Sequence, residues 1–294
     1  MSFNDQKRLD PSQVQDRRGR STGRSTGRTV VVGGGLGLLV LIVSMFLGID
    51  PSALLGDAIS SDPGPGYSQD AAELATECQT GADANQREDC QLVGFVNSIQ
   101  AFWTEELPNY GMNYVPAQTV LFSGSTQAAC GFASSASGPF YCPRDRMVYV
   151  DLSFFDTILA RLGARGGPLA MAYVVAHEYG HHVQNLFGVL NTSGAIQDTG
   201  PESDIVFTEL QADCLAGIWM SHATQTGYIS SLSREDILQA LDAAATVGDD
   251  RIQQQTQGYI VPDAWTHGSS QQRLDALQDG LASGDIESCN TPGW

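Results

Sequence analysis

The stretch Pro168-Leu-Ala-Met-Ala-Tyr-Val-Val-Ala-His177-Glu-Tyr-Gly-His181 organises this chain of 294 residues. It opens with a proline and continues as an apolar run, which is typical of a buried helix that carries polar groups into a core. Residues i and i+4 of a helix are about 40° apart, so His177 and His181 lie on one face. Glu178 is rotated by about 100° from His177 and lies beside that face. The stretch therefore predicts a helix that presents two imidazoles together, with a carboxylate next to them.

A second stretch, Glu209-Leu-Gln-Ala-Asp213, repeats the i, i+4 spacing with two carboxylates. Two histidines and one carboxylate are the ligands of a class of catalytic zinc sites that keep a fourth position open. We therefore predict one Zn²⁺ per chain, held by His177, His181 and Glu209. Glu178 is the expected general base, because a base that acts on water must lie close to the metal without binding it. Asp213 is placed to accept a hydrogen bond from the outer N–H of a ligand, His177 being the first choice.

Two polar neighbours of these motifs are expected to have other roles. His182 is about 140° around the helix from His177 and cannot share its ion, so we predict a packed or capping histidine. Cys214 is turned by about 140° from Glu209, which argues against a zinc thiolate.

Hydrolysis of an amide also needs a donor, besides the metal, for the oxyanion that develops. His267, in the segment Thr266-His-Gly268, is the best candidate, with Arg273 as its structural companion. Tyr149, Tyr259 and a backbone N–H remain alternatives.

Basic residues are concentrated near the N-terminus, and the rest of the chain is acidic. Residues 1–28 hold seven basic and three acidic residues, a net charge of +4; the remainder holds eight against thirty, a net charge of −22, and the total is −18. A body this acidic repels phosphate backbones, so no nucleic-acid partner is expected. The arm repeats Arg-Ser-Thr-Gly and is predicted to be disordered over residues 1–28.

Residues 30–49 form a run of 20 residues without a charge. As a helix this run is about 30 Å long, which matches a bilayer core and predicts a transmembrane helix over residues 29–49. The basic arm precedes the run, so the positive-inside rule places residues 1–28 in the cytoplasm and the rest outside. A cleaved signal peptide is the alternative, but the long arm and the absence of a clear A-x-A site favour an uncleaved anchor.

All six cysteines follow the predicted membrane span, where an oxidising compartment would favour disulfides. Six cysteines allow 15 pairings. Proximity in the sequence favours the pairs Cys78–Cys90 and Cys130–Cys142. Elimination then pairs Cys214 with Cys289.

Residues 50–66 include a Pro- and Gly-rich stretch and predict a linker to a single domain over residues 67–294. The fold class is α+β and mostly helical, preceded by the one transmembrane helix. Apolar periodicity predicts helices over residues 91–107, 204–224, 234–247 and 270–283, and strands at 118–122 and 147–152. Ser233 is the expected N-cap of the third helix.

These motifs resemble a bacterial family of neutral zinc metallopeptidases that are single-pass membrane proteins. The resemblance covers nearly the whole chain and is carried by Asp50-Pro51, Gly138-Pro-Phe-Tyr-Cys-Pro143, Val148-Tyr-Val-Asp-Leu-Ser-Phe-Phe155, His177-Glu-Tyr-Gly-His-His-Val-Gln184, Glu209-Leu-Gln-Ala-Asp-Cys214 and His267-Gly-Ser-Ser-Gln-Gln-Arg273. More distantly, the ExxxD motif and a histidine six residues before an arginine are similar to membrane-associated gluzincins that process lipidated or misfolded proteins. That similarity implies a gluzincin-like domain with a small edge sheet, a carbonyl-polarising His267, and a strand at residues 147–152 that edges the cleft and binds an extended substrate by strand addition.

The predicted function is hydrolysis of peptide or protein substrates outside the cytoplasmic membrane by a zinc peptidase anchored through one N-terminal helix. A zinc hydrolase of another amide, from the cell wall or a small molecule, would use the same metal chemistry. A non-catalytic, zinc-stabilised envelope binding protein is the other alternative, but it would have no use for a base at Glu178. No pattern in the sequence sets an oligomeric state.

Overall fold

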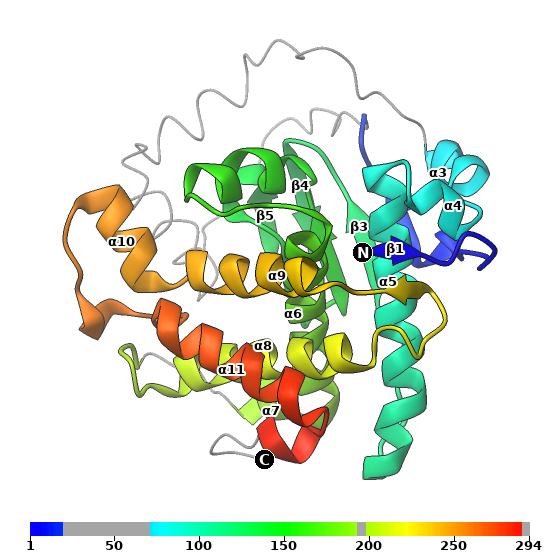
Figure 1. Cartoon of the computed structure of the whole chain (residues 1–294). Helices are drawn as coiled ribbons and strands as arrows, with labels where there is room; N and C mark the ends of the chain where they lie inside the picture. Colours follow the sequence, from blue (N-terminus) through cyan, green and yellow to red (C-terminus); the bar gives the residue numbers. More distant parts are fainter. Residues whose placement is uncertain (20–70, 193–197, 290–294) are drawn as a thin grey trace.

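The computed structural model describes residues 1–19, 71–192 and 198–289, and Figure 1 shows a mostly helical α+β fold. The α-helices are α3 (Ala71–Glu77), α4 (Gly81–Ala84), α5 (Glu88–Glu106), α6 (Pro168–Phe187), α7 (Val189–Thr192), α8 (Asp204–His222), α9 (Arg234–Thr246), α10 (Asp249–Gln257) and α11 (Ser270–Ser283). The strands are β1 (Ser2–Phe3), β2 (Val14–Asp16), β3 (Gln118–Leu121), β4 (Ser125–Ala128), β5 (Gly131–Ser134), β6 (Phe140–Cys142), β7 (Met147–Val150) and β8 (Ile229–Ser231).

Helix α6 is the central element, in contact with α5, α8 and α9 and with the strands β6 and β7. Its neighbour α8 packs in turn on α11 through two glycines. A Cβ on Gly280 would lie 1.9 Å from the Cys214 carbonyl oxygen, and one on Gly217 would lie 2.3 Å from that of Leu277. Any larger residue would therefore separate the two helices, and α8 is the helix that carries Glu209.

The principal sheet has the strand order β2-β3-β7-β6, in which β2, β3 and β7 are parallel and β6 is antiparallel to β7. The implied role of residues 147–152 as the strand that edges the cleft is wrong, because β7 is paired on both sides. The chain turns back after Cys142, where Arg146 adopts a left-handed conformation (φ 58°) and its N–H donates to the Cys142 carbonyl at 2.8 Å. This hairpin places β6 outside β7 and makes β6, like β2, an edge strand of the described sheet.

The prediction that residues 1–28 are disordered is wrong for residues 1–19. Strand β1 pairs with β8, and β2 pairs with β3. The Arg-Ser-Thr-Gly repeats that motivated the prediction begin only at residue 20, whereas the first part of the arm contains apolar residues that become buried: Phe3, Leu9 and Val14.

Within the described ranges, no helix combines the length and the apolar character needed to cross a bilayer. The predicted span at 29–49 and the predicted linker at 50–66 lie outside those ranges.

Three disulfides fasten the described parts of the domain, and their pairings are the ones predicted. Two of them, Cys78–Cys90 and Cys130–Cys142, each join cysteines that are 12 residues apart. The third, Cys214–Cys289, has a sequence separation of 75 residues and ties the segment after α11 to α8.

Candidate metal centre

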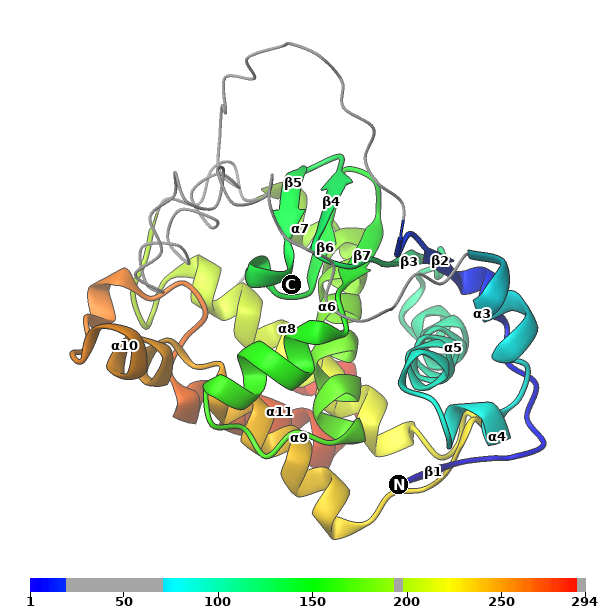
Figure 2. The same cartoon turned by 90° about the horizontal axis from the view of Figure 1, so that it is seen from above.

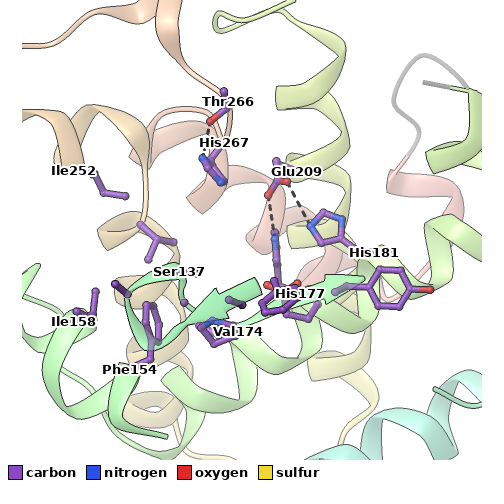
Figure 3. Close-up of a pocket in the computed structure, with 18 of the residues that line it drawn as sticks. Ser137, Phe154, Ile158, Val174, His177, His181, Glu209, Ile252, Thr266 and His267 are labelled. Carbon is purple, nitrogen blue, oxygen red and sulfur yellow. Dashed lines mark hydrogen bonds and ion pairs between the residues drawn. The ribbon is translucent and has the colours of Figure 1, made fainter. Parts of the chain in front are cut away.

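Helix α6 delivers the two predicted histidine ligands to one point. It begins with Pro168 at the first helical position, where the missing N–H costs nothing, and it is buried along most of its length. The Nε2 atom of His177 lies 3.2 Å from one carboxylate oxygen of Glu209, and that of His181 lies 3.5 Å from the other. Figure 3 shows both imidazoles directed at Glu209.

Helix α8 supplies Glu209, and a glycine permits its close approach to α6. Its N-terminus is capped by Ser203, whose side chain accepts from the N–H of Val206. A Cβ on Gly180 would lie only 2.9 Å from the carbonyl oxygen of Ala212. Gly180 therefore sets the spacing at which the histidines of α6 meet the carboxylate of α8.

The three side chains fit a zinc ion. Their ligand atoms all lie within 4.8 Å of one another. Bonds of about 2.0–2.2 Å in tetrahedral geometry place ligand atoms about 3.3–3.5 Å apart, which is close to the two nitrogen–oxygen distances seen here. Two imidazoles and one carboxylate would give zinc three ligands and leave a fourth position open.

The electrostatics of the site favour a cation. Burial lowers the pKa of His177, but the carboxylates of Asp213 and Glu209 outweigh it and raise this pKa to about 10. For His181 burial again lowers the pKa, and Glu209 reverses the direction. Burial would raise the pKa of Glu209, but the two imidazoles hold it well below its ordinary value, and His181 has the larger effect. A pocket that holds protons on its imidazoles in this way would also hold a divalent cation in their place.

Asp213 lies where the sequence predicts, behind His177. It accepts a hydrogen bond from Nδ1 of that histidine at 2.8 Å and one from the hydroxyl of Tyr173 at 2.6 Å. Arg273 donates to both of its oxygens, at 2.8 and 3.0 Å. Burial would raise the pKa of Asp213, but Arg273 outweighs it and the pKa falls to about 2. Arg273 was expected as the companion of His267; its hydrogen bonds go instead to Asp213, Tyr173 and the Val247 carbonyl, and its Nη2 lies 3.3 Å from Nδ1 of His177.

His181 has an orienting partner that the sequence analysis missed. Its Nδ1–H donates to the side-chain oxygen of Gln184 at 2.8 Å. The amide nitrogen of Gln184 donates to Gln211 at 2.8 Å and to the carbonyl of Thr208 at 2.7 Å, so Gln184 is itself fixed by α8. The signal was available, because Gln184 follows His181 by three residues on the same helix.

Glu178 is buried and lines the same cavity as the ligands. Its pKa is raised, chiefly by burial, against the opposing effect of the two histidines. The backbone of Tyr141, in strand β6, also acts to lower this pKa. Tyr141 and Glu178 line the same cavity, so the expected base lies close to the sheet.

His267 also lines the cavity and is held by a carboxylate that the sequence analysis missed. Asp249, the first residue of α10, accepts hydrogen bonds from the backbone N–H groups of Thr266, His267 and Gly268 at 2.7, 2.7 and 3.1 Å. Its other oxygen lies 3.3 Å from Nδ1 of His267. Burial lowers the pKa of His267, but Asp249 outweighs it and the net shift is upward.

The two tyrosine alternatives to His267 lie elsewhere. The Tyr149 hydroxyl donates a hydrogen bond to Asp145 at 2.8 Å, and Tyr259 lies in a loop and is itself 61% exposed. Neither tyrosine lines the cavity. His182 accepts a hydrogen bond from the Tyr141 hydroxyl at 3.0 Å through Nδ1, and its Nε2–H donates to the Val115 carbonyl at 2.7 Å. Burial lowers the pKa of His182 to about 4, as befits a packed neutral histidine.

A cavity of about 370 Å³ extends from the metal centre and is mostly apolar away from it. Figure 3 shows Phe154, Ile158 and Ile252 to the left of His177, with His267 above. The apolar lining comes from β5 and β6, the segment after β7, helices α6 and α10 and the residue that follows α9. It consists largely of Phe132, Phe140, Phe154, Ile158, Leu162, Val174, Val247 and Ile252.

The chain is similar to bacterial proteins over nearly its whole length. Over residues 1–292 it matches the family described as "Putative neutral zinc metallopeptidase". "Uncharacterized protein YpfJ" of Escherichia coli K12 is 37% identical over 301 residues, which cover 98% of each chain. "Uncharacterized protein Rv2575" of Mycobacterium tuberculosis H37Rv is 45% identical over 264 residues, which cover 84% of each chain.

No solved structure is significantly similar to the chain. The family match indicates a zinc peptidase, and the two histidines and the glutamate that converge in the structure are residue types that bind zinc. The chain therefore belongs to the family of putative neutral zinc metallopeptidases.

Proposed function

We propose that this protein is a zinc-dependent peptidase in which Glu178 is the general base and His267 stabilises the oxyanion. One observation carries the proposal: the presumptive ligands His177, His181 and Glu209 open onto the same cavity as these two residues. A purely structural metal site would need neither a buried carboxylate beside the ligands nor an open space in front of them.

Zinc at this site would supply a Lewis acid that polarises a carbonyl group and lowers the pKa of a water molecule. The carboxylate of Glu178 accepts the proton from the attacking water and passes it to the nitrogen of the leaving amine. Its raised pKa suits this exchange, because a carboxylate with an ordinary pKa would hold the proton too weakly to deliver it. His267 donates from Nε2 to the carbonyl oxygen as negative charge develops, while Asp249 keeps the ring protonated and oriented.

The surroundings of the cavity favour an extended peptide as substrate. The described strands leave one side of β6 unpaired, and β6 contributes Phe140 and Tyr141 to the cavity that Glu178 also lines. A peptide added to this edge would place one side chain in the apolar part of the cavity. We therefore propose peptides with a bulky apolar residue next to the cleaved bond.

The proposed location of the domain is outside the cytoplasmic membrane, with the run at residues 30–49 as its membrane attachment. Support comes from the cysteines: all six are joined in disulfides, which persist in oxidising compartments and are rare in the cytosol.

The decisive experiment compares the zinc-loaded protein with its Glu178→Gln variant on a pool of natural peptides. The variant should keep its zinc while hydrolysis falls by about 10²–10⁴, because the amide cannot accept a proton from water. Mass spectrometry of the products should find bulky apolar residues enriched beside the cleaved bonds. Equal cleavage by both proteins would place the base elsewhere, and a zinc-loaded wild type that cleaves no peptide would reject the peptidase assignment.

A further inference from the structure

The first 19 residues are built into the domain rather than laid on its surface. Strand β2 extends the principal sheet by parallel pairing with β3, in the register Val14–Thr119 to Asp16–Leu121. Strand β1 pairs with β8 at the opposite side of α5, where Ser2 faces Ser231. Both views of the fold show this segment running beside α5 (Figures 1 and 2).

The rest of the domain is shaped to receive this segment. The Phe3 ring packs on the Phe95 ring with centroids 5.0 Å apart, and only 3% of Phe3 is exposed. A Cβ on Gly94 would lie 2.5 Å from the Phe3 ring, and one on Gly81 would lie 2.0 Å from the backbone oxygen of Asn4. Two glycines in α4 and α5 thus leave the space that residues 3 and 4 fill.

Buried charge fixes the other end of the segment. The guanidinium of Arg18 binds Asp16 at 2.6 Å and Asp89 of α5 at 3.2 Å, and all three side chains are at least nine-tenths buried. Removing residues 1–19 would take Arg18 away from Asp89 and uncover the apolar surface under Phe3. Asp89 would then keep its ion pair with Arg87 but lose the one with Arg18, and both changes favour the segment in place.

We infer that residues 1–19 and residues 71–289 lie on the same side of the cytoplasmic membrane. A single crossing between residue 19 and residue 71 would put β2 and β3 on opposite sides, where they could not pair. The cytoplasmic placement predicted for the basic arm is incompatible with this packing if the disulfide-bonded domain is outside.

An engineered disulfide in the full-length, membrane-located protein tests the pairing. The hydroxyl oxygens of Ser2 and Ser231 are 2.9 Å apart, and all native cysteines are already bonded. The double variant Ser2→Cys/Ser231→Cys should therefore cross-link under a mild oxidant and yield the linked peptide in mass spectrometry. The control Ser2→Cys/Gln271→Cys, with the second cysteine on α11, should not. Absence of the first cross-link would overturn the inference.

Sidedness is then measured by adding a membrane-impermeant maleimide to intact spheroplasts. Gln6 and Gln271 are both exposed, and each is replaced by cysteine in a separate variant. Equal labelling of the two variants, whether both react or both require permeabilisation, supports the inference. Labelling of Gln271→Cys with protection of Gln6→Cys would overturn it and restore the single-crossing topology. Neither readout depends on zinc or on hydrolysis, so the proposed function is tested separately.

Discussion

His177 uses its two ring nitrogens for different partners: Nε2 faces Glu209, and Nδ1 faces Asp213. In the metal-free protein these carboxylates raise its pKa to about 10, against about 6.5 for an imidazole in an unfolded chain. Protonation of His177 therefore stabilises the metal-free fold fully below about pH 6.5, and this stabilisation is lost as the pH rises toward 10.

Zinc has to displace that proton, so zinc affinity should increase with pH over the same window. Each displaced proton contributes about a tenfold change in Kd per pH unit. Competition with a chromophoric chelator at about pH 6, 7 and 8 measures the slope. A Kd that does not change with pH would show that His177 is not a ligand.

His267 should act only on the transition state. His267→Ala is expected to lower kcat by about 10²–10³ with little change in KM or zinc content, because the donor is lost only where charge develops. Tyr149→Phe is the matched control, since its hydroxyl binds Asp145 outside the cavity. Loss of zinc from His267→Ala would make this residue a ligand, and an unchanged kcat would remove it from the mechanism.

At the scale of the helices, the spacing between α6 and α8 sets the geometry of the metal centre. Replacing a glycine inside a helix by alanine ordinarily stabilises a protein by about 0.5–1 kcal/mol. Gly180→Ala should instead destabilise by about 1–3 kcal/mol, because the added methyl would meet the Ala212 carbonyl at 2.9 Å. Zinc affinity should fall by about tenfold or more, although no ligand is altered.

Gly217→Ala provides the control for this prediction, because it crowds the contact between α8 and α11 instead. It should lower the free energy of unfolding with a smaller loss of zinc affinity. Denaturant titration and the chelator assay give both quantities for each variant. Tighter or equal zinc binding by Gly180→Ala would show that the helix spacing is not critical.

The elements with strong apolar periodicity could be predicted from the sequence. The helix predicted over 204–224 is α8 (Asp204–His222), the one over 270–283 is α11, and the N-cap at Ser233 is present with its capping box. Helix α10 could not be found this way, because its sequence Asp-Asp-Arg-Ile-Gln-Gln-Gln-Thr-Gln has a single apolar residue and its place is set by tertiary contacts.

The site residues also differ in whether local sequence spacing or tertiary packing sets their positions. The two histidines could be predicted to lie together because helical spacing fixes i and i+4 within one element. Asp249 could not, because its relation to His267 arises only when the start of α10 packs on the loop before α11. The edge role was assigned to the wrong strand for a similar reason, since sheet order depends on the short hairpin that adds β6 outside β7.

For the molecule as a whole, Cys214–Cys289 is the disulfide with the greatest expected effect on stability. It closes a loop with a sequence separation of 75 residues, for which the chain-entropy estimate is about 4 kcal/mol. The double variant Cys214→Ala/Cys289→Ala should lose about that much in the free energy of unfolding and show a lower Tm, measured at saturating zinc. A change below about 1 kcal/mol would mean that the segment after α11 is held by other contacts.

The parallel pairing of β2 with β3 also has a consequence for the order in which the chain folds during synthesis. Val14 finds its partner only at Thr119, and Ser2 finds its partner only at Ser231. At about 5–20 residues per second, β2 waits on the order of ten seconds after its own synthesis before its neighbour β3 exists, and β1 waits longer for β8. The start of the chain is therefore among the last parts to be placed, and nascent chains halted before Thr119 would still expose residues 1–19 to proteases.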